Sequence, residues 1–247
     1  MVKTCDACGR PLPFFTGLFH ARCDACRSRH TRTRAGEPAG VKPHLVRRNL
    51  TRIGGGIEYY HLQDWLFNNF SYEEQDTILA VYHPSGPKVT SPVPGKKTPS
   101  VKSVVGFLSG MAGWFKNPEY RQIGYKIIEK GESLISEKTP VMDKHFLYQA
   151  KMENYYRNRD TDDFALPVAM EACRQQIGIA KEARLALLQE YRNSPLPSHA
   201  GYSQLCVILE HQKNYDEAIR LAAEAKEQGW AGNWDERIGK CRKEMER

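Results

Sequence analysis

Four of the seven cysteines in this chain lie between residues 5 and 26, where the tetrapeptide Cys-Asp-Ala-Cys occurs twice with 14 residues between the copies. Such pairs could form disulfides or hold a metal. Disulfides need an oxidising compartment, and the N-terminal residues show no apolar run of an export signal, so we expect a reducing, cytoplasmic location. In that setting two C-x2-C pairs are typical of structural zinc. We therefore expect one Zn²⁺, bound by Cys5, Cys8, Cys23 and Cys26.

Two nearby histidines offer alternative ligands. Cys23, Cys26 and His30 have a workable spacing for zinc, and His20 lies between the cysteine pairs. With four thiolates available, both histidines are expected in solvent or beside the ligands. A four-thiolate site leaves no open position for water, whereas a catalytic zinc keeps one. The predicted metal is therefore structural.

The cysteine pattern resembles zinc-ribbon and treble-clef modules over residues 1–35. The resemblance implies a small metal-dependent module that binds nucleic acid or protein, or braces a fold. So small a module has almost no core, and structural zinc supplies roughly 10 kcal/mol or more of folding free energy in such cases.

Positive charge is concentrated near the N-terminus. Residues 1–52 contain 11 Lys or Arg and 3 Asp or Glu, a net charge of +8, while the whole chain carries +7. A basic stretch beside a zinc module is typical of contact with nucleic acid, but it also suits a solvated tail or an acidic protein partner. The candidate phosphate-binding residues are Arg27, Arg29, Arg32, Arg34, Arg47, Arg48 and Arg52.

Beyond the zinc module the sequence divides into four parts. Residues 36–56 form a basic linker, and residues 57–82 have the helical spacing of a hairpin, with a capping box at Ser71 and Glu74. Residues 83–102 hold five prolines and read as a linker or exposed loop. From residue 103 to residue 247 the periodicity is helical throughout. No run of about 18 apolar residues occurs, so no membrane span is expected.

The stretch GYSQLCVILEHQKNYDEAIRLAAEAKEQGW, residues 201–230, resembles a tetratricopeptide repeat. That family packs two antiparallel helices with small residues where they cross. It departs from the motif at Cys206, where glycine is usual, and at Gly229-Trp230, where proline is usual. The resemblance assigns packing roles to Leu205, Cys206, Tyr215, Ala218, Leu221 and Ala225, and Glu224 is expected on the exposed face.

A weaker copy of this pattern covers residues 144–180. Its first helix carries Phe146, Tyr155 and Tyr156, and its second carries Ala169 and Cys173. A single repeat cannot bury its apolar face, so at least three stacked helical pairs are expected. The predicted fold is therefore mostly α, a helical-hairpin array similar to tetratricopeptide repeats, with a small N-terminal four-cysteine zinc module.

The remaining residues that could do chemistry are isolated in the sequence. Cys173, Cys206 and Cys241 are far apart and are expected to be buried, and no acid partner is visible for three histidines of the helical part: His145, His199 and His211. No nucleophile elbow, carboxylate dyad or phosphate loop is present. We expect a non-enzymatic adaptor that binds a protein partner through the helical surface. The alternatives are a nucleic-acid-binding protein that uses residues 27–52, and an enzyme whose site is assembled from scattered residues.

Overall fold

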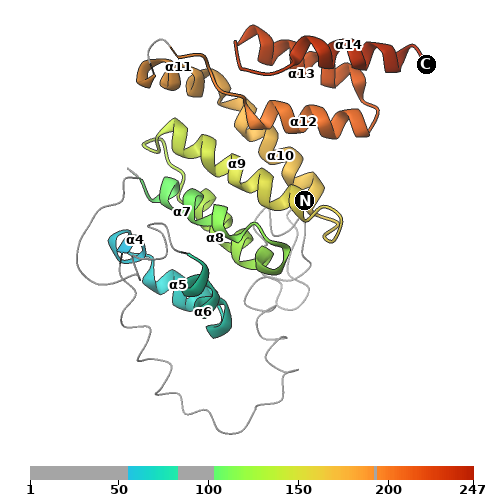
Figure 1. Ribbon diagram of the computed structural model, residues 1–247. Coiled ribbons are helices and arrows are strands. Elements are labelled where there is room, and N and C mark those ends of the chain that lie inside the picture. Colours follow the sequence, from blue (N-terminus) through green and yellow to red (C-terminus); the bar gives the residue numbers. More distant parts are fainter. Residues whose placement is uncertain (1–54, 83–102, 192–193) are drawn as a thin grey trace, which may run out of the picture. The chain divides into compact units, whose positions relative to one another are not determined.

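The structure is a computed structural model that describes residues 55–82, 103–191 and 194–247 (Figure 1). All of them belong to the unit Arg52–Arg247. The described residues form α-helices and short 3-10 turns without any β-strand, which confirms the expectation of a mostly helical chain for this part. The predicted zinc module, residues 36–54 of the predicted linker and the proline-rich segment 83–102 lie outside the described residues.

A membrane-spanning helix would need a long apolar stretch. None of the helices in the described ranges is both long and apolar enough to cross a bilayer.

The segment expected to be a two-helix hairpin contains three short helices. His61 adopts the left-handed conformation, with φ 54°, which ends the first helix, and a second helix starts two residues later. The predicted capping box is confirmed: Ser71 Oγ accepts from the Glu74 N–H at 3.2 Å, and the Glu74 carboxylate accepts from the Ser71 N–H at 2.8 Å. The three helices are α4 (Gly55–Tyr59), α5 (Gln63–Asn69) and α6 (Tyr72–Val81).

The next helix, α7 (Val104–Ala112), is almost entirely buried. Its N-cap Ser103 accepts a hydrogen bond from the N–H of Gly106 at 3.2 Å. A helix that is apolar on every side needs neighbours on every side, and α7 packs against both helices that follow it. These are α8 (Arg121–Ser133), reached through the 3-10 turns η1 (Gly113–Phe115) and η2 (Pro118–Tyr120), and α9 (Val141–Arg157).

Helix α9 packs most extensively against α10 (Ala165–Gly178), and these two helices cover the predicted weaker repeat. Ala169 and Cys173 of α10 are fully buried. Phe146 of α9 has half of its side chain exposed. Helix α11 (Ala180–Glu190) follows, with Ala180 and Ala183 buried against its neighbours.

The C-terminal helices are α12 (Ala200–His211), α13 (Tyr215–Glu227) and α14 (Trp234–Met245). The turn between α12 and α13 places Lys213 at φ 58°, and Asn214 then caps α13 by accepting from the Glu217 N–H. Gly229 directly follows the C-cap of α13 and has φ 81°, a conformation that glycine adopts without a steric penalty.

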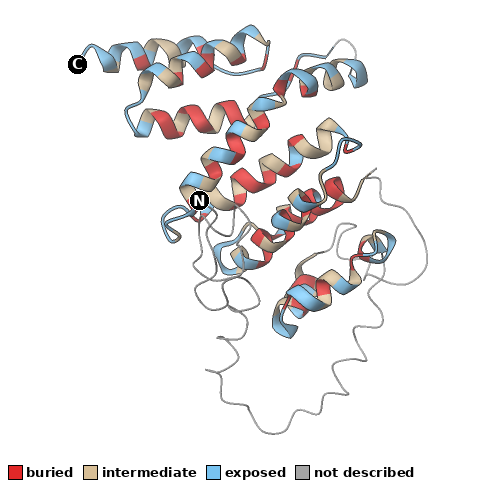
Figure 2. Ribbon diagram, turned by 180° about the vertical axis from the view of Figure 1, so that it is seen from behind, coloured by how far each residue is buried: buried red, intermediate tan, exposed pale blue. Residues whose placement is uncertain are grey.

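From α7 onward, most helices pack against those that follow closely in the chain. Helix α10 contacts α12, α12 contacts α13, and α13 contacts α14. One apolar cluster runs from α9 to α14, and Figure 2 shows buried residues along α7, α9 and α12 in particular. This order of packing is what a stack of helical hairpins requires.

A short backbone contact links the two ends of the α12–α13 hairpin. Ser198, in the extended segment before α12, forms a parallel bridge with Ala231, in the turn after α13. The N–H of Ala231 donates to the carbonyl of Pro197 at 3.2 Å. The chain that enters the hairpin therefore touches the chain that leaves it.

Candidate functional site

The residues predicted to bind zinc and phosphate lie outside the described residues, so their arrangement stays a prediction. They are Cys5, Cys8, Cys23 and Cys26 for the metal, and Arg27, Arg29, Arg32, Arg34, Arg47, Arg48 and Arg52 for nucleic acid. Within residues 55–82, 103–191 and 194–247, no group of three or more His, Cys, Asp or Glu side chains could hold a metal ion.

The α12–α13 interface is built from small and medium apolar side chains. Ala218 and Ala225 are fully buried, and Cys206 Sγ lies 3.5 Å from the Ala218 carbonyl oxygen. The close approach of a sulfur to a backbone carbonyl shows how little space the helices leave between them. Leu205 and Leu221 are also buried, and Tyr215 is partly buried against the same cluster.

Glu224 is not on an open face, contrary to the expectation. Its carboxylate accepts a hydrogen bond from the hydroxyl of Tyr202 at 2.7 Å and from Gln228 at 3.2 Å. Tyr202 is a fully buried residue of α12, so this bond ties α12 to the last turns of α13. Burial raises the pKa of the Tyr202 hydroxyl, and the contact with Glu224 raises it further.

Two histidines that are 54 residues apart in the sequence meet in the core. His145 of α9 is 6% exposed and His199, the N-cap of α12, is fully buried. Their ring centroids are 5.0 Å apart, and Trp230 packs 4.7 Å from His199. Gln176 of α10 joins them: its amide nitrogen lies 3.2 Å from Nε2 of His145, and its oxygen accepts from the Gly201 N–H at 2.6 Å.

The hydrogen bonds determine the protonation of both rings. The Gln176 oxygen accepts from the Gly201 N–H, so the Gln176 NH₂ group faces His145. Nε2 of His145 must therefore accept a hydrogen bond, and the proton of the neutral ring lies on Nδ1. His199 Nδ1 accepts from the Tyr202 N–H at 3.3 Å, so its proton lies on Nε2. In each ring the basic nitrogen already faces a donor.

Burial reinforces this neutral state. Desolvation lowers the pKa of His145 to about 4, and desolvation together with the neighbouring His145 lowers that of His199 to about 3. The pair is therefore a neutral polar contact where α9, α10 and α12 meet. Sequence reasoning treated both histidines as isolated because no local spacing relates residues on different helices.

A row of aromatic rings joins the N-terminal helices to α7. Tyr59 and Tyr60 at the end of α4 lie edge to face, with ring centroids 4.9 Å apart, and Tyr60 lies 5.3 Å from Phe107 of α7. Phe107 is 6.1 Å from Tyr82, the C-cap of α6, and Tyr82 is 5.9 Å from Trp114 in η1. We call these five residues the aromatic row.

Both ends of the aromatic row reach the surface. Tyr59 is 54% exposed and Trp114 is 43% exposed, whereas Phe107 is buried as the floor of the row. Burial raises the pKa of the Tyr82 hydroxyl to about 12, so it stays neutral. Gly56 permits the close approach of α4, because a Cβ there would lie 2.2 Å from the Phe107 ring.

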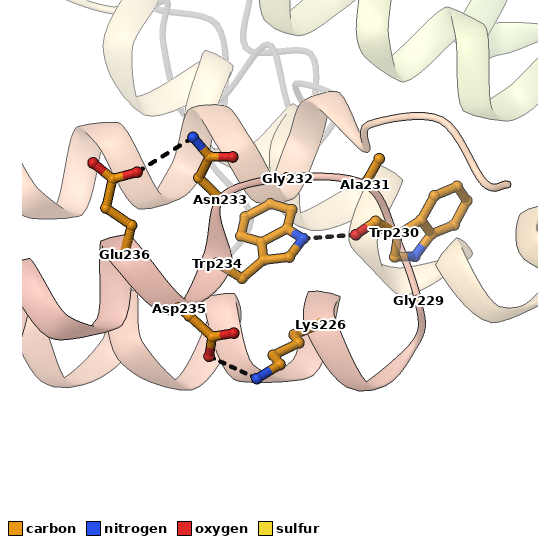
Figure 3. A pocket seen from close by; sticks show the side chains of 9 residues that line it. All are labelled: Lys226, Gly229, Trp230, Ala231, Gly232, Asn233, Trp234, Asp235 and Glu236. Carbon is orange, nitrogen blue, oxygen red and sulfur yellow. Dashed lines mark hydrogen bonds and ion pairs between the residues drawn. The ribbon is translucent and has the colours of Figure 1, made fainter.

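A shallow hollow of about 510 Å³ lies beside the turn between α13 and α14. Figure 3 shows Trp234 at its centre, with its indole N–H donating to the Trp230 carbonyl at 2.7 Å. The Lys226–Asp235 ion pair closes one side of it. Every charged group drawn there already has a partner, so the hollow offers shape rather than a reactive group.

The three cysteines of the helical part are buried, as expected, and they are poor nucleophiles. Desolvation raises the thiol pKa of Cys173 to about 12 and that of Cys206 to about 11. A thiol that stays protonated at neutral pH neither attacks a substrate nor binds a metal readily.

The aromatic row is exposed at both ends and is built from several elements of the described part. Its members come from α4, α6, α7 and η1, so the fold and not local sequence assembles it. Comparison of the chain with protein-family models, curated proteins and solved structures finds no significant match, and its function therefore has to be argued from these surfaces.

Proposed function

We propose that this protein is a non-enzymatic adaptor, which binds a protein partner through its helical part and carries a structural zinc module as a second contact surface. One observation carries the proposal: the α12–α13 hairpin packs through fully buried alanines within helices that stack largely in chain order. That arrangement is what the resemblance to tetratricopeptide repeats implies. Arrays of this kind present extended surfaces that hold a peptide or helix of another protein.

Exposed apolar side chains supply candidate anchors for such a partner. Phe146 of α9 is 50% exposed, and Tyr191, which directly follows α11, is 55% exposed. Large aromatic side chains provide much of the binding energy at protein interfaces.

The zinc module is the part of the proposal that is simplest to test. We expect one zinc per chain, held by Cys5, Cys8, Cys23 and Cys26, because the chain offers two C-x2-C pairs. Elemental analysis of the purified full chain measures it. A metal content near zero, with the four thiols freely reactive under native conditions, contradicts the site.

The basic N-terminal region favours a second candidate function, binding to nucleic acid. Residues 1–52 carry +8 while residues 53–247 carry −1, from the whole-chain net charge of +7. Arginine side chains in such a stretch would neutralise phosphates, and binding would weaken steeply as salt rises.

A pull-down with the intact chain, with and without nuclease, separates the two functions. The adaptor proposal expects a protein partner that is retained after nuclease treatment. The matched control is a variant with Arg27, Arg29 and Arg32 changed to Gln, which should keep that partner. Loss of all partners on nuclease treatment, and their loss from the Gln variant, would move the function to nucleic-acid binding.

A further inference from the structure

Three of the five members of the aromatic row, Tyr59, Tyr60 and Tyr82, belong to an acidic part of the chain. Residues 55–82 contain five Asp or Glu and no Lys or Arg. Glu74 is engaged by Lys126 of α8 at 2.7 Å, but the other four carboxylate residues are exposed: Glu58, Asp64, Glu73 and Asp76. Unbalanced negative charge on these helices repels nucleic acid and favours a basic ligand.

The adjoining segment of the same chain has the complementary composition. Residues 83–102 read HPSGPKVTSPVPGKKTPSVK and contain five prolines and four lysines, with no Asp or Glu. The segment starts immediately after Tyr82, a member of the row. It ends immediately before Ser103, the N-cap of the helix that carries Phe107. Both of its ends are therefore attached next to the row.

We propose that the aromatic row is a docking surface whose occupant is the chain's own proline-rich segment, residues 83–102. Proline rings stack on tyrosine and tryptophan faces, and aromatic-lined surfaces bind proline-rich peptides because these need little ordering. The lysines of the segment supply charge opposite to that of residues 55–82.

Attachment at both ends makes this contact favourable. A ligand tethered by a short connection has an effective concentration on the order of millimolar, so even a weak contact is largely formed within the chain. The centroids of neighbouring rings in the row are 4.9–6.1 Å apart. At about 3.1 Å per residue in an extended proline helix, a segment of this length can cross the row and return. This inference goes beyond the adaptor function and does not depend on it.

The first test follows the four tryptophan indole N–H signals of the full chain by nuclear magnetic resonance. Replacing the five prolines by serine should shift the Trp114 signal, because the rings that stack against the row are removed. The signals of Trp230 and Trp234 serve as internal controls, since their N–H groups are hydrogen-bonded near the α13–α14 turn. A variant with serine in place of the four lysines should also shift the Trp114 signal, and high salt should shift the wild-type signal in the same direction.

The second test supplies the segment as a separate peptide. In a full chain whose residues 83–102 are replaced by a Gly-Ser stretch of equal length, the peptide should bind and shift the Trp114 signal. Its apparent affinity for the intact chain should be about tenfold lower, because the tethered copy competes. With binding followed on a labelled peptide, Trp114→Ala in the Gly-Ser chain should lose the binding, and Trp65→Ala should keep it.

Three outcomes would overturn the proposal. The first is a Trp114 signal that stays in place in both segment variants. The second is a peptide that binds the intact and the Gly-Ser chains equally well. The third is a single-stranded oligonucleotide that shifts the Trp114 signal of the intact chain, which would assign the row to nucleic acid instead.

Discussion

At the scale of single residues, Ala218 shows how tightly the α12–α13 hairpin is packed. Its side chain is fully buried and its carbonyl oxygen lies 3.5 Å from Cys206 Sγ. A leucine there would have to displace α12, and overpacking of this kind typically costs about 1–3 kcal/mol. We expect Ala218→Leu to lower the free energy of unfolding by that amount, measured by chemical denaturation.

The matched control is five residues away on the same helix. Ala223 is exposed, so Ala223→Leu should change stability by no more than about 0.5 kcal/mol. Equal effects of the two substitutions would show that α12 and α13 do not approach each other at Ala218. Glu224 is unsuitable as a control, because its carboxylate holds the Tyr202 hydroxyl.

The buried histidine pair makes stability depend on pH in a defined window. The folded-state pKa values of His145 and His199 are lowered to about 4 and about 3, below an unfolded value of about 6.5. Within this window the unfolded chain binds more protons than the folded one, so stability rises with pH. The contribution is complete above about pH 6.5 and is lost as the pH falls toward 4.

A substitution isolates this effect from other titrating groups. Asparagine is a good N-cap that can accept from the Tyr202 N–H, so His199→Asn keeps the cap and removes one titrating ring. Between pH 7 and pH 5, the thermal midpoint of the helical part should fall less in His199→Asn than in the wild type. Identical pH dependence of the two proteins would contradict the buried neutral state of His199.

At the scale of helices, we expect alanine substitutions of one glycine on α12 and one on α14 to change the free energy of unfolding in opposite directions. A Cβ on Gly201 would lie 2.7 Å from the Gln176 oxygen and 3.0 Å from the Cys173 carbonyl oxygen, so Gly201→Ala should push α12 away from α10. We expect a loss of about 1–3 kcal/mol. A Cβ on Gly239 of α14 meets no atom within 4 Å, so Gly239→Ala should gain about 0.5–1 kcal/mol.

Denaturant unfolding of the two glycine variants beside the wild type checks this pair. The sign of the change is the decisive result, because both substitutions add the same methyl group to a helix. If Gly201→Ala also stabilised the protein, the contact between α10 and α12 at this point would be wrong.

Local patterns predicted the helices better than the contacts between them. The capping box at Ser71 depends on residues three apart, and it was found where the sequence placed it. The interruption of α4 could not be foreseen, because nothing in the apolar spacing marks His61 for a left-handed backbone. His145 and His199 are 54 positions apart in the sequence, and the two ends of the aromatic row, Tyr59 and Trp114, are 55 positions apart. Contacts between such distant residues follow from tertiary packing alone.

At the scale of the whole molecule, the helical part has a core that requires no metal. One apolar cluster runs from α9 to α14, and it belongs to the unit Arg52–Arg247. Replacing Cys23 by serine removes one predicted zinc ligand from the N-terminal module. We therefore expect Cys23→Ser to lose its zinc while keeping the helical circular dichroism signal and the thermal midpoint of the helical part.

The control for this experiment is Cys241→Ser, which changes a buried cysteine of the helical part. That variant should keep its zinc and lower the thermal midpoint, because a hydroxyl replaces a thiol in an apolar site. A collapse of the helical signal in Cys23→Ser would show instead that the two parts of the chain share one core.

Because Ser198 and Ala231 form a backbone bridge, we expect the α12–α13 hairpin to resist a pulling force better than α14 does. A pull applied at the C-terminus reaches α14 first, and that helix can peel from α13 one turn at a time. The force then reaches Ala231, whose N–H is hydrogen-bonded to the carbonyl of Pro197, just before the start of α12. Because the bridge ties the entry of α12 to the exit of α13, it shields both helices until it breaks. Under tension, α14 should therefore yield before the hairpin, and the hairpin should yield as a unit.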